Sequence, residues 1–340
     1  MTLLSQAFDK AQLLRCKGYD TKFINRKTTV SCEKVVPPLL KEELPAVEGS
    51  KKKILHYNGL SVLYHAARRV PMVAAYNIDG SSKESVKRTS FRKDPRMDPA
   101  IQLSQEDFYN LRTDITEFEI GHMAANNEMA WGADAQLQSY RTFHYPNSVP
   151  QAERLNSGIW KSLETYIINE SASISGHQRI AVFTGPILKK NDPSYKEDPS
   201  FQIPLCFYKV VVFEAGNQLY ATGFIMSHYE RMKAQNMFGS VTGRTLKAAD
   251  IDPGFFGDFP YKKVFQVNIK LIEEETGLKF TWAGVKKIPV PGQVNQVKKI
   301  KAIDSVADAQ KAGSPSRSPV RLSNKSNSNS GLRLNLILPV

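Results

Sequence analysis

The sequence predicts an α+β fold built on a central antiparallel or mixed sheet that is flanked by helices. Two observations lead to this class. The strand-like segments are short, rich in aromatic and β-branched residues, and occur in neighbouring pairs. The helical patterns are few and do not alternate regularly with strands, as a parallel sheet of βαβ units would require. With 340 residues and 41% apolar content, the chain can form one large domain or two small ones.

Five segments are predicted to be strands, in the order in which they occur. ILHYNGLSVLYHAA (54–67) and RVPMVAAYNID (69–79) look like two strands joined by a turn. RIAVFTGPIL (179–188), IPLCFYKVVVFEA (203–215) and QLYATGFIMS (218–227) follow. The last two segments are separated by Gly-Asn, a dipeptide that favours tight hairpins.

Two segments are predicted to be helices. The first covers about 155–171 and carries Trp160 and Leu163 on an apolar side. The second covers about 268–275, where Asn268 is a candidate N-cap and Gly277 a candidate terminator.

The net charge of +13 lies at the two ends of the chain. Residues 1–60 carry 11 basic and 6 acidic side chains, and residues 281–340 carry 10 and 2, so that 61–280 is neutral with 25 of each. Basic ends would raise affinity for nucleic acids through phosphate contacts, without reading a base sequence. Alternatively, the basic ends of the chain are extensions that only increase solubility.

Composition divides the chain into three parts. Residues 1–53 are predicted to be an N-terminal extension, in which 33–53 resembles a linker or a loosely packed arm because of its prolines and its run of lysines. Residues 54–290 are the predicted folded domain. Residues 291–340 are predicted to be a basic, low-complexity tail, and the Ser/Asn/Pro-rich stretch 303–331 is typical of disorder.

Several classes of protein are excluded by simple features. The sequence has no run of about 18 apolar residues, so no membrane span is expected. The first 20 residues lack the apolar core of a signal peptide, which favours a cytoplasmic protein, with export by a route without a cleaved signal as the alternative. Cys16, Cys32 and Cys206 form no CxxC pair, which argues against a zinc site and a disulfide framework.

One histidine, one asparagine and one glutamate stand out as a candidate site. His122 follows a strand-like run, and Asn156 and Glu164 lie eight residues apart on a predicted helix, which places them within about 80° of each other. An imidazole, a neutral oxygen ligand and a carboxylate suffice to activate water beside Mg²⁺. This is the chemistry of phosphodiester hydrolysis. The structural alternatives are a helix N-cap for Asn156 and a solvated helix residue for Glu164.

The order and spacing of eight short segments resemble the DNA/RNA non-specific endonuclease family, the ββα-metal nucleases that include endonuclease G-like enzymes. The resemblance runs from about residue 55 to residue 280. The segments are YNIDG (76–80), FRKDPRMD (91–98), EIGH (119–122), TFHYPNSVPQ (142–151), LNSGIWKSLE (155–164), FTGPIL (183–188), IPLCFYKVVV (203–212) and EEETGL (273–278).

The resemblance implies roles for particular residues. His122 corresponds to the general base, Asn156 to the direct protein ligand of Mg²⁺, for which Mn²⁺ is the alternative ion, and Glu164 to the carboxylate that orders the metal's water shell. Arg88 or Arg92 corresponds to an arginine that stabilises the transition state, and we favour Arg88. The implied site is therefore catalytic His122, Glu164 and Arg88, substrate-binding Arg92, Glu119 and Asn147, and metal-binding Asn156.

One segment departs from the family pattern. The family signature Asp-Arg-Gly-His is Glu119-Ile120-Gly121-His122 in this chain. Glutamate keeps the charge on a longer arm, but Ile120 removes a cation expected near the scissile phosphate. Losing one such contact costs on the order of a few kcal/mol of transition-state stabilisation. The departure therefore predicts reduced or restricted activity.

The function predicted from the resemblance is Mg²⁺-dependent hydrolysis of DNA and RNA, with little preference for base sequence. Nucleic acid is the predicted partner, no membrane is expected, and a homodimer and an inhibitor or activating protein are further expected partners. The first alternative is a catalytically weakened nuclease fold that binds nucleic acid or protein. The second is a phosphodiesterase for small nucleotides. With an unperturbed histidine as base, activity is expected to fall below about pH 6.5.

Overall fold

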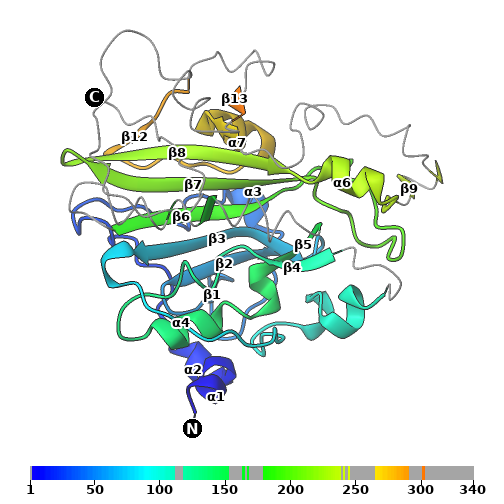
Figure 1. Ribbon diagram of the computed structural model, residues 1–340, viewed down its shortest axis with the longest axis horizontal. Coiled ribbons are helices and arrows are strands. Elements are labelled where there is room, and N and C mark those ends of the chain that lie inside the picture. The colour runs from blue at the N-terminus through cyan, green and yellow to red at the C-terminus, as the bar shows by residue number, and fades with distance from the viewer. Residues whose placement is uncertain are drawn as a thin grey trace, which may run out of the picture.

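A nine-stranded sheet forms the centre of the molecule (Figure 1). The computed structural model describes residues 2–111, 118–152, 163–164, 167, 179–238, 240–241, 244–245, 265–290 and 301–302. The sheet has the order β1-β2-β3-β6-β7-β8-β11-β13, and β12 pairs with β8. Its strands are β1 (Leu55–His56), β2 (Leu60–His65), β3 (Val70–Asp79), β6 (Arg179–Ile187), β7 (Cys206–Ala215), β8 (Gln218–Ser227), β11 (Phe265–Val267), β12 (Val285–Lys287) and β13 (Lys301–Ala302).

Every pairing in this sheet is antiparallel except β12 with β8, which is parallel. The predicted α+β class with an antiparallel or mixed sheet is therefore confirmed. All five predicted strand segments are confirmed as well. The turn between β7 and β8 is the expected tight hairpin, and Gly216 and Asn217 both adopt positive φ angles there, which suits a Gly-Asn turn.

Short helices and two small ribbons complete the described fold. Helices α1 and α2 contact each other, and α1 also packs on α4 (Figure 1). The ribbon β4–β5 lies beside the sheet and carries His122 at the end of β4. The elements are α1 (Leu3–Phe8), α2 (Lys10–Leu14), α3 (Pro38–Lys41), α4 (Ala135–Arg141), α6 (Tyr229–Ala234), α7 (Ile269–Thr276), β4 (Phe118–His122), β5 (Ser148–Ala152), β9 (Ser240–Val241) and β10 (Arg244–Thr245).

The two predicted helices have different outcomes. Helix α7 is confirmed, and Gly277 ends it in the left-handed conformation with a φ of 74°. Asn268 precedes α7, but its side chain makes no capping bond and instead pairs with the backbone of Val290, accepting from the amide nitrogen at 2.9 Å. Most of the predicted helix 155–171 lies outside the described residues. The three residues of this stretch that the structure describes, 163, 164 and 167, are helical.

The prediction of a loosely packed arm over 33–53 is wrong. Val35, Val36, Leu44 and Val47 are buried and belong to the main hydrophobic core. The backbone of Val35 also accepts a hydrogen bond from the amide of Lys279, at 2.8 Å. The apolar residues in this stretch are not spaced as in a helix or a strand, and so their burial could not be predicted from the local sequence. The boundary at residue 53 stays a prediction.

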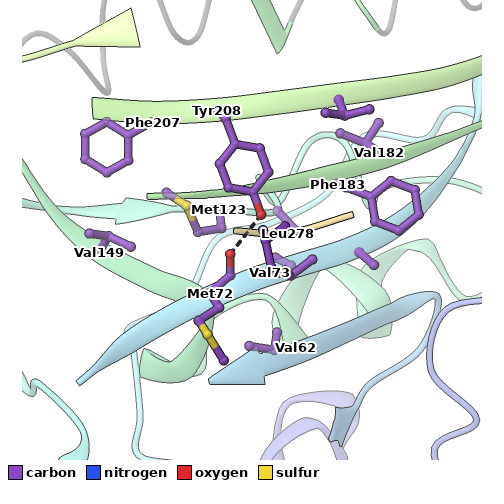
Figure 2. Packing of buried hydrophobic residues seen from close by; sticks show 14 of the residues in the cluster. Val62, Met72, Val73, Met123, Val149, Val182, Phe183, Phe207, Tyr208 and Leu278 are labelled. Carbon is purple, nitrogen blue, oxygen red and sulfur yellow. Dashed lines mark hydrogen bonds between the residues drawn. The ribbon is translucent and has the colours of Figure 1, made fainter. Parts of the chain in front are cut away.

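The hydrophobic core fixes the position of the segment that carries the candidate base. Figure 2 shows Met123 and Val149 among the buried side chains around β3, β6 and β7. Tyr208 of β7 spans the same core, and its hydroxyl donates to the carbonyl oxygen of Met72 at 2.8 Å (Figure 2). Because Met123 directly follows His122 and is fully buried, the end of β4 is anchored to the sheet.

Among the helices that the structure describes, none is long and apolar enough to cross a lipid bilayer.

Candidate active site

The ribbon β4–β5 presents His122 at its end. The register pairs His122 with Ser148, Gly121 with Val149 and Glu119 with Gln151. Successive side chains of a strand point to opposite faces. Ile120 therefore shares the ribbon face of His122, whereas Glu119 lies on the opposite face.

Asn147 supports the turn that follows His122. Its side-chain oxygen accepts from the amide of Ala124 at 3.0 Å, and its side-chain nitrogen donates to the carbonyl oxygens of Ala124 and Thr142 at 3.0 and 2.9 Å. Its backbone carbonyl accepts from the amide of Met123 at 2.8 Å. The residue is fully buried. Since both the oxygen and the nitrogen of the side chain have backbone partners, the arrangement suits a residue that supports the site, and the substrate contact of Asn147 stays a prediction.

His122 lies in an aromatic pocket. Its ring centroid is 4.5 Å from that of Phe91 and 4.6 Å from that of Phe143, and the residue is only 5% exposed. Among the described residues, no hydrogen-bond partner reaches its Nε2 atom. Burial lowers the pKa of His122 to about 3, with a smaller contribution from the positive charge of Arg88. The imidazole is therefore neutral, with a nitrogen able to accept a proton.

The expectation of an activity loss below pH 6.5 uses the pKa of a solvated histidine, and the burial of His122 favours a different pH profile. The two phenylalanine rings come from segments on either side of β4 in the sequence, and the expectation did not include their effect. Desolvation disfavours the charged imidazolium, and so His122 stays neutral well below pH 6.5.

Arg88 and Arg92 have different surroundings, although both are exposed. The Arg88 guanidinium lies 5.4 Å from the centroid of Phe143, the ring that also contacts His122, and it donates to the side-chain oxygen of Asn126 at 3.1 Å. The Arg92 guanidinium lies over the ring of Phe8 in α1, at 4.9 Å. The structure thus brings Arg88, and not Arg92, next to His122.

Glu164 lies against a buried charged cluster. One of its carboxylate oxygens is 3.6 Å from Nζ of Lys209, which is fully buried in β7. Lys209 also donates to Glu128 at 3.1 Å and to the hydroxyl of Tyr76 at 3.0 Å. Sequence reasoning missed Lys209 and Glu128. The available signal was a lysine in the middle of the apolar strand CFYKVVVFEA.

Gln151 is a second residue that sequence reasoning missed. It is 0% exposed, and neither its side-chain oxygen nor its side-chain nitrogen has a hydrogen-bond partner within the described part of the chain. It packs against the backbone of Gly121, where a Cβ atom would lie 2.1 Å from the side-chain oxygen of Gln151. Gly121 is therefore required by close packing next to His122.

Replacing Gly121 by alanine is expected to lower the activity of the site by about 10²-fold, because the new methyl group displaces Gln151 and shifts His122 by on the order of 1 Å. Initial rates of plasmid cleavage would measure the effect. Gly223→Ala is a matched control, since a Cβ there would also be too close to a side chain, at 2.7 Å from Ile272. Stability would fall in both variants, and equal loss of activity in both would contradict a role specific to Gly121.

The predicted metal ligand Asn156 lies outside the described residues. Within the described part of the chain, no group of three or more His, Cys, Asp or Glu side chains could hold a metal ion. The chemistry of the described residues fits a divalent ion that is held mainly by water. Glu164 supplies a carboxylate that can accept from metal-bound water, and Mg²⁺ commonly keeps several waters beside one or two protein oxygens.

Three buried histidines predict acid-sensitive stability. Burial lowers the pKa of His122 to about 3, and the pKa values of His144 and His228 to about 4. The unfolded chain protonates these rings near pH 6.5, so it binds more protons than the folded chain below that pH. Stability is therefore complete above about pH 6.5 and falls as the pH decreases, by about 2 kcal/mol per histidine between pH 7 and pH 5. Urea unfolding at the two pH values would measure this.

The control for this prediction is His228→Gln. In the wild-type ring, Nδ1 accepts from the amide of Ala152 at 3.2 Å, and Nε2 lies 2.7 Å from the carbonyl oxygen of Pro204. Protonation of Nδ1 would remove the first bond. The variant should lose the share of His228, about 2 kcal/mol of the difference between pH 7 and pH 5. An equal free energy of unfolding at pH 7 and pH 5 in the wild type would contradict the prediction.

Comparison with known proteins identifies the class of protein that this fold and site define. The family model described as DNA/RNA non-specific endonuclease matches residues 42–287. The chain belongs to this family, which confirms the resemblance seen in the sequence segments.

Two individual relatives share about a quarter of their residues with this chain over the matched regions. The human mitochondrial nuclease EXOG is 24% identical over 274 residues, which are 79% of this chain and 66% of the relative. A nuclease of Serratia marcescens is 25% identical over 214 residues, which are 62% of this chain and 68% of the relative. The chain thus spans about two thirds of the length of each. A crystal structure of the EndoG/EndoGI complex, which concerns the mechanism of EndoG inhibition, has a TM-score of 0.46 at 18% identity and covers 72% of this chain and 91% of that one.

Proposed function

We propose that the protein is a metal-dependent endonuclease that hydrolyses phosphodiester bonds in both DNA and RNA. The observation that carries the proposal is the state of His122. Its ring is buried and neutral, and its Nε2 atom has no hydrogen-bond partner among the described residues. A neutral imidazole beside an arginine is the arrangement required of a general base that acts on water next to a phosphate.

His122, Arg88 and Asn147 each have a part in the proposed reaction. Nε2 of His122 takes a proton from the attacking water as its oxygen bonds to phosphorus. The bond from phosphorus to the 3′-oxygen breaks, the 3′-oxygen takes a proton from solvent water, and His122 later releases its proton to solvent, so that the products are a 5′-phosphate and a 3′-hydroxyl. Arg88, held by the ring of Phe143 and the side chain of Asn126, can pair with a phosphate oxygen. Asn147 keeps the backbone after His122 in place.

A divalent ion, Mg²⁺ with Mn²⁺ as the alternative, would be held by Asn156 and by the water shell that Glu164 orders. When bound, such an ion supplies positive charge that polarises a phosphate oxygen and stabilises a leaving oxygen. The carboxylate chemistry of Glu164 supports this assignment.

The proposed partner is nucleic acid, bound through its backbone. Exposed Arg88 and Arg92 on the 80–96 segment favour contacts to phosphates, which carry no base-sequence information. An inhibitor or activating protein and a second copy of the chain are further proposed partners, and cytoplasmic residence is the proposed location.

Purified wild-type protein, incubated with supercoiled plasmid and separately with single-stranded RNA, tests the proposed function. We expect both substrates to be cleaved with Mg²⁺ and to remain intact with EDTA. Cleavage of only one of the two polymers would contradict the lack of sugar preference. Intact substrates with Mg²⁺ and with Mn²⁺ would contradict the nuclease assignment and favour a nucleic-acid-binding module.

Replacing Ile120 by arginine is expected to raise the cleavage rate by about tenfold or more, because Ile120 lies on the ribbon face of His122 and an arginine there would add a charge-assisted contact to phosphate. Plasmid cleavage by Ile120→Arg and by the uncharged control Ile120→Gln would be compared. An equal rise in both variants would show that positive charge is not the cause. If the arginine variant cleaves plasmid and the wild type does not, the wild-type chain is the catalytically weakened nuclease fold that the first alternative describes.

A further inference from the structure

Lys209 is the most unusual charged residue in the described sheet. It lies in the middle of β7, paired in register with Thr184 of β6 and Phe224 of β8, and its side chain is completely buried. A buried ammonium group costs several kcal/mol unless it is paired and hydrogen-bonded. Such a residue in a central strand therefore needs a specific set of partners.

Three oxygen atoms lie around the ammonium group, two of them at hydrogen-bond distance and the third at ion-pair distance. Nζ of Lys209 lies 3.0 Å from the Tyr76 hydroxyl, 3.1 Å from a carboxylate oxygen of Glu128 and 3.6 Å from a carboxylate oxygen of Glu164. Tyr76 donates its own proton to Glu128 at 2.7 Å, and so its oxygen is available to accept from Lys209. Two directional hydrogen bonds therefore hold the ammonium group in place, and from that position it forms an ion pair with Glu164.

Glu128 connects this cluster to the segment that carries His122. The oxygen of Glu128 that accepts from Tyr76 also accepts from the amide of Ala125, at 3.1 Å, and Ala125 lies three residues after His122. Tyr76 belongs to β3 and Lys209 to β7, two strands of the central sheet. Two strands of one rigid sheet thus hold both the His122 segment, through Glu128, and the Glu164 carboxylate.

We propose that Lys209 is a positioning residue for the reaction: it fixes the Glu164 carboxylate in its ionised form and, through Glu128, at a constant distance from His122. This inference rests on the proposed function for its catalytic consequence. Lys209 itself is buried and acts through Glu164. The chemistry that Glu164 serves, acceptance of hydrogen bonds from a hydrated cation or water, requires the charged carboxylate.

A purely structural role would give a different pattern of mutant effects. If Lys209 only stabilised the sheet, its loss would lower stability and would lower activity to the same extent with or without Glu164. If it acts through Glu164, its loss should have little further effect once Glu164 has been neutralised. A double-mutant cycle on the cleavage rate distinguishes the two roles.

The cycle uses Lys209→Met, Glu164→Gln and the double variant, with single-turnover plasmid cleavage at saturating Mg²⁺ as the activity. We expect Lys209→Met to lower the rate by about 10- to 100-fold in the wild type and by less than about twofold in Glu164→Gln. Equal losses in both backgrounds would overturn the proposal. Tyr208→Phe, which removes a buried hydrogen bond from the neighbouring position of β7, is the control and should keep wild-type activity.

Lys209→Met alone leaves the carboxylates of Glu128 and Glu164 buried without the ammonium group between them, which can prevent folding. A second pair of variants avoids this problem. Of the two carboxylates described beside Lys209, Glu128→Gln and Glu128→Gln/Lys209→Met each keep only that of Glu164. Infrared difference spectra against the matching Glu164→Gln proteins report whether Glu164 is protonated. Among the described residues, Lys209 pairs with Glu164, the charge of Glu164 acts on Tyr76, and Glu128 shares the ammonium group of Lys209. We expect protonation of Glu164 to move to higher pH, by at least about one pH unit, when Lys209 is replaced.

The infrared measurement does not depend on catalysis. A wild-type protein that cleaves no nucleic acid would contradict the proposed function, and the spectra would still test the effect of Lys209 on Glu164. An unchanged protonation of Glu164 in Glu128→Gln/Lys209→Met would overturn the positioning role even in an active nuclease.

Discussion

Replacing His122 by alanine is expected to lower the rate of phosphodiester cleavage by about 10²- to 10⁴-fold, the usual contribution of a general base. The ring lies between Phe91 and Phe143, and burial lowers its pKa to about 3, so wild-type His122 is neutral at every pH at which the protein would be assayed. Steady-state cleavage of plasmid at pH 7 would measure the loss.

Two further measurements separate a chemical role from a structural one. His65→Ala replaces a partly buried histidine of β2 and should change the rate by less than about twofold. Added imidazole should restore part of the activity of His122→Ala, since it can occupy the vacated aromatic pocket and accept the proton. A His122→Ala enzyme with the wild-type rate would remove the residue from the mechanism.

The pH profile of the wild type gives an independent check on His122. Since a proton binds the buried ring only near pH 3, the rate should not fall with a midpoint near 6.5 in the range where the protein stays folded. A fall in kcat/KM with that midpoint would show that the base is solvated in the working enzyme.

Replacing Asp94 by alanine is expected to destabilise the fold by about 3–5 kcal/mol, because it leaves the buried guanidinium of Arg96 without its negatively charged partner. The two side chains form a two-pronged ion pair, with distances of 3.0 and 2.7 Å. Tyr57 donates to the same carboxylate at 2.6 Å. Equilibrium unfolding in guanidinium chloride would measure the change.

The contacts of Asp94 with Arg96 and Tyr57 lower its pKa. Burial alone would raise it, but the hydrogen bonds and charge of Arg96, with His144 and Tyr57, lower the pKa of Asp94 to about 2. The stability contributed by Asp94 is therefore present above its ordinary pKa of about 3.8 and is lost as the pH falls through about 2.

The exposed ion pair Lys93–Asp107 is the matched control for Asp94→Ala, and Asp107→Ala should cost less than about 1 kcal/mol of stability. Equal costs at the two positions would contradict the special role of burial.

The strands of the central sheet could be predicted from the sequence because their signals are local. Alternating or continuous apolar segments bounded by turn residues define β2, β3, β6, β7 and β8, and the Gly-Asn dipeptide defines the hairpin between β7 and β8. The position of His122 at the end of a strand could also be predicted from the local pattern.

Other features could not be predicted because they depend on contacts between distant segments. The low pKa of His122 comes from burial, with Phe91 and Phe143 against its ring, and the partners of Lys209 come from β3, the His122 segment and the Glu164 segment. Asn268 has the residue type of an N-cap, yet its amide pairs with Val290, 22 residues away. Burial of Val35 and Leu44 likewise depends on the rest of the core.

The way in which the first 35 residues pack has a consequence for biosynthesis. Arg96 donates to the carbonyl oxygen of Leu13 at 3.1 Å, the Phe8 ring lies 4.8 Å from that of His144, and the indole of Trp282 donates to the carbonyl oxygen of Ser31 at 2.9 Å. Contacts of such large sequence separation form slowly and late. On the ribosome, the N-terminal segment therefore has to wait for residue 282 before its last partner exists. A chain whose folding is completed so late reaches its final structure only after residue 282 has been translated.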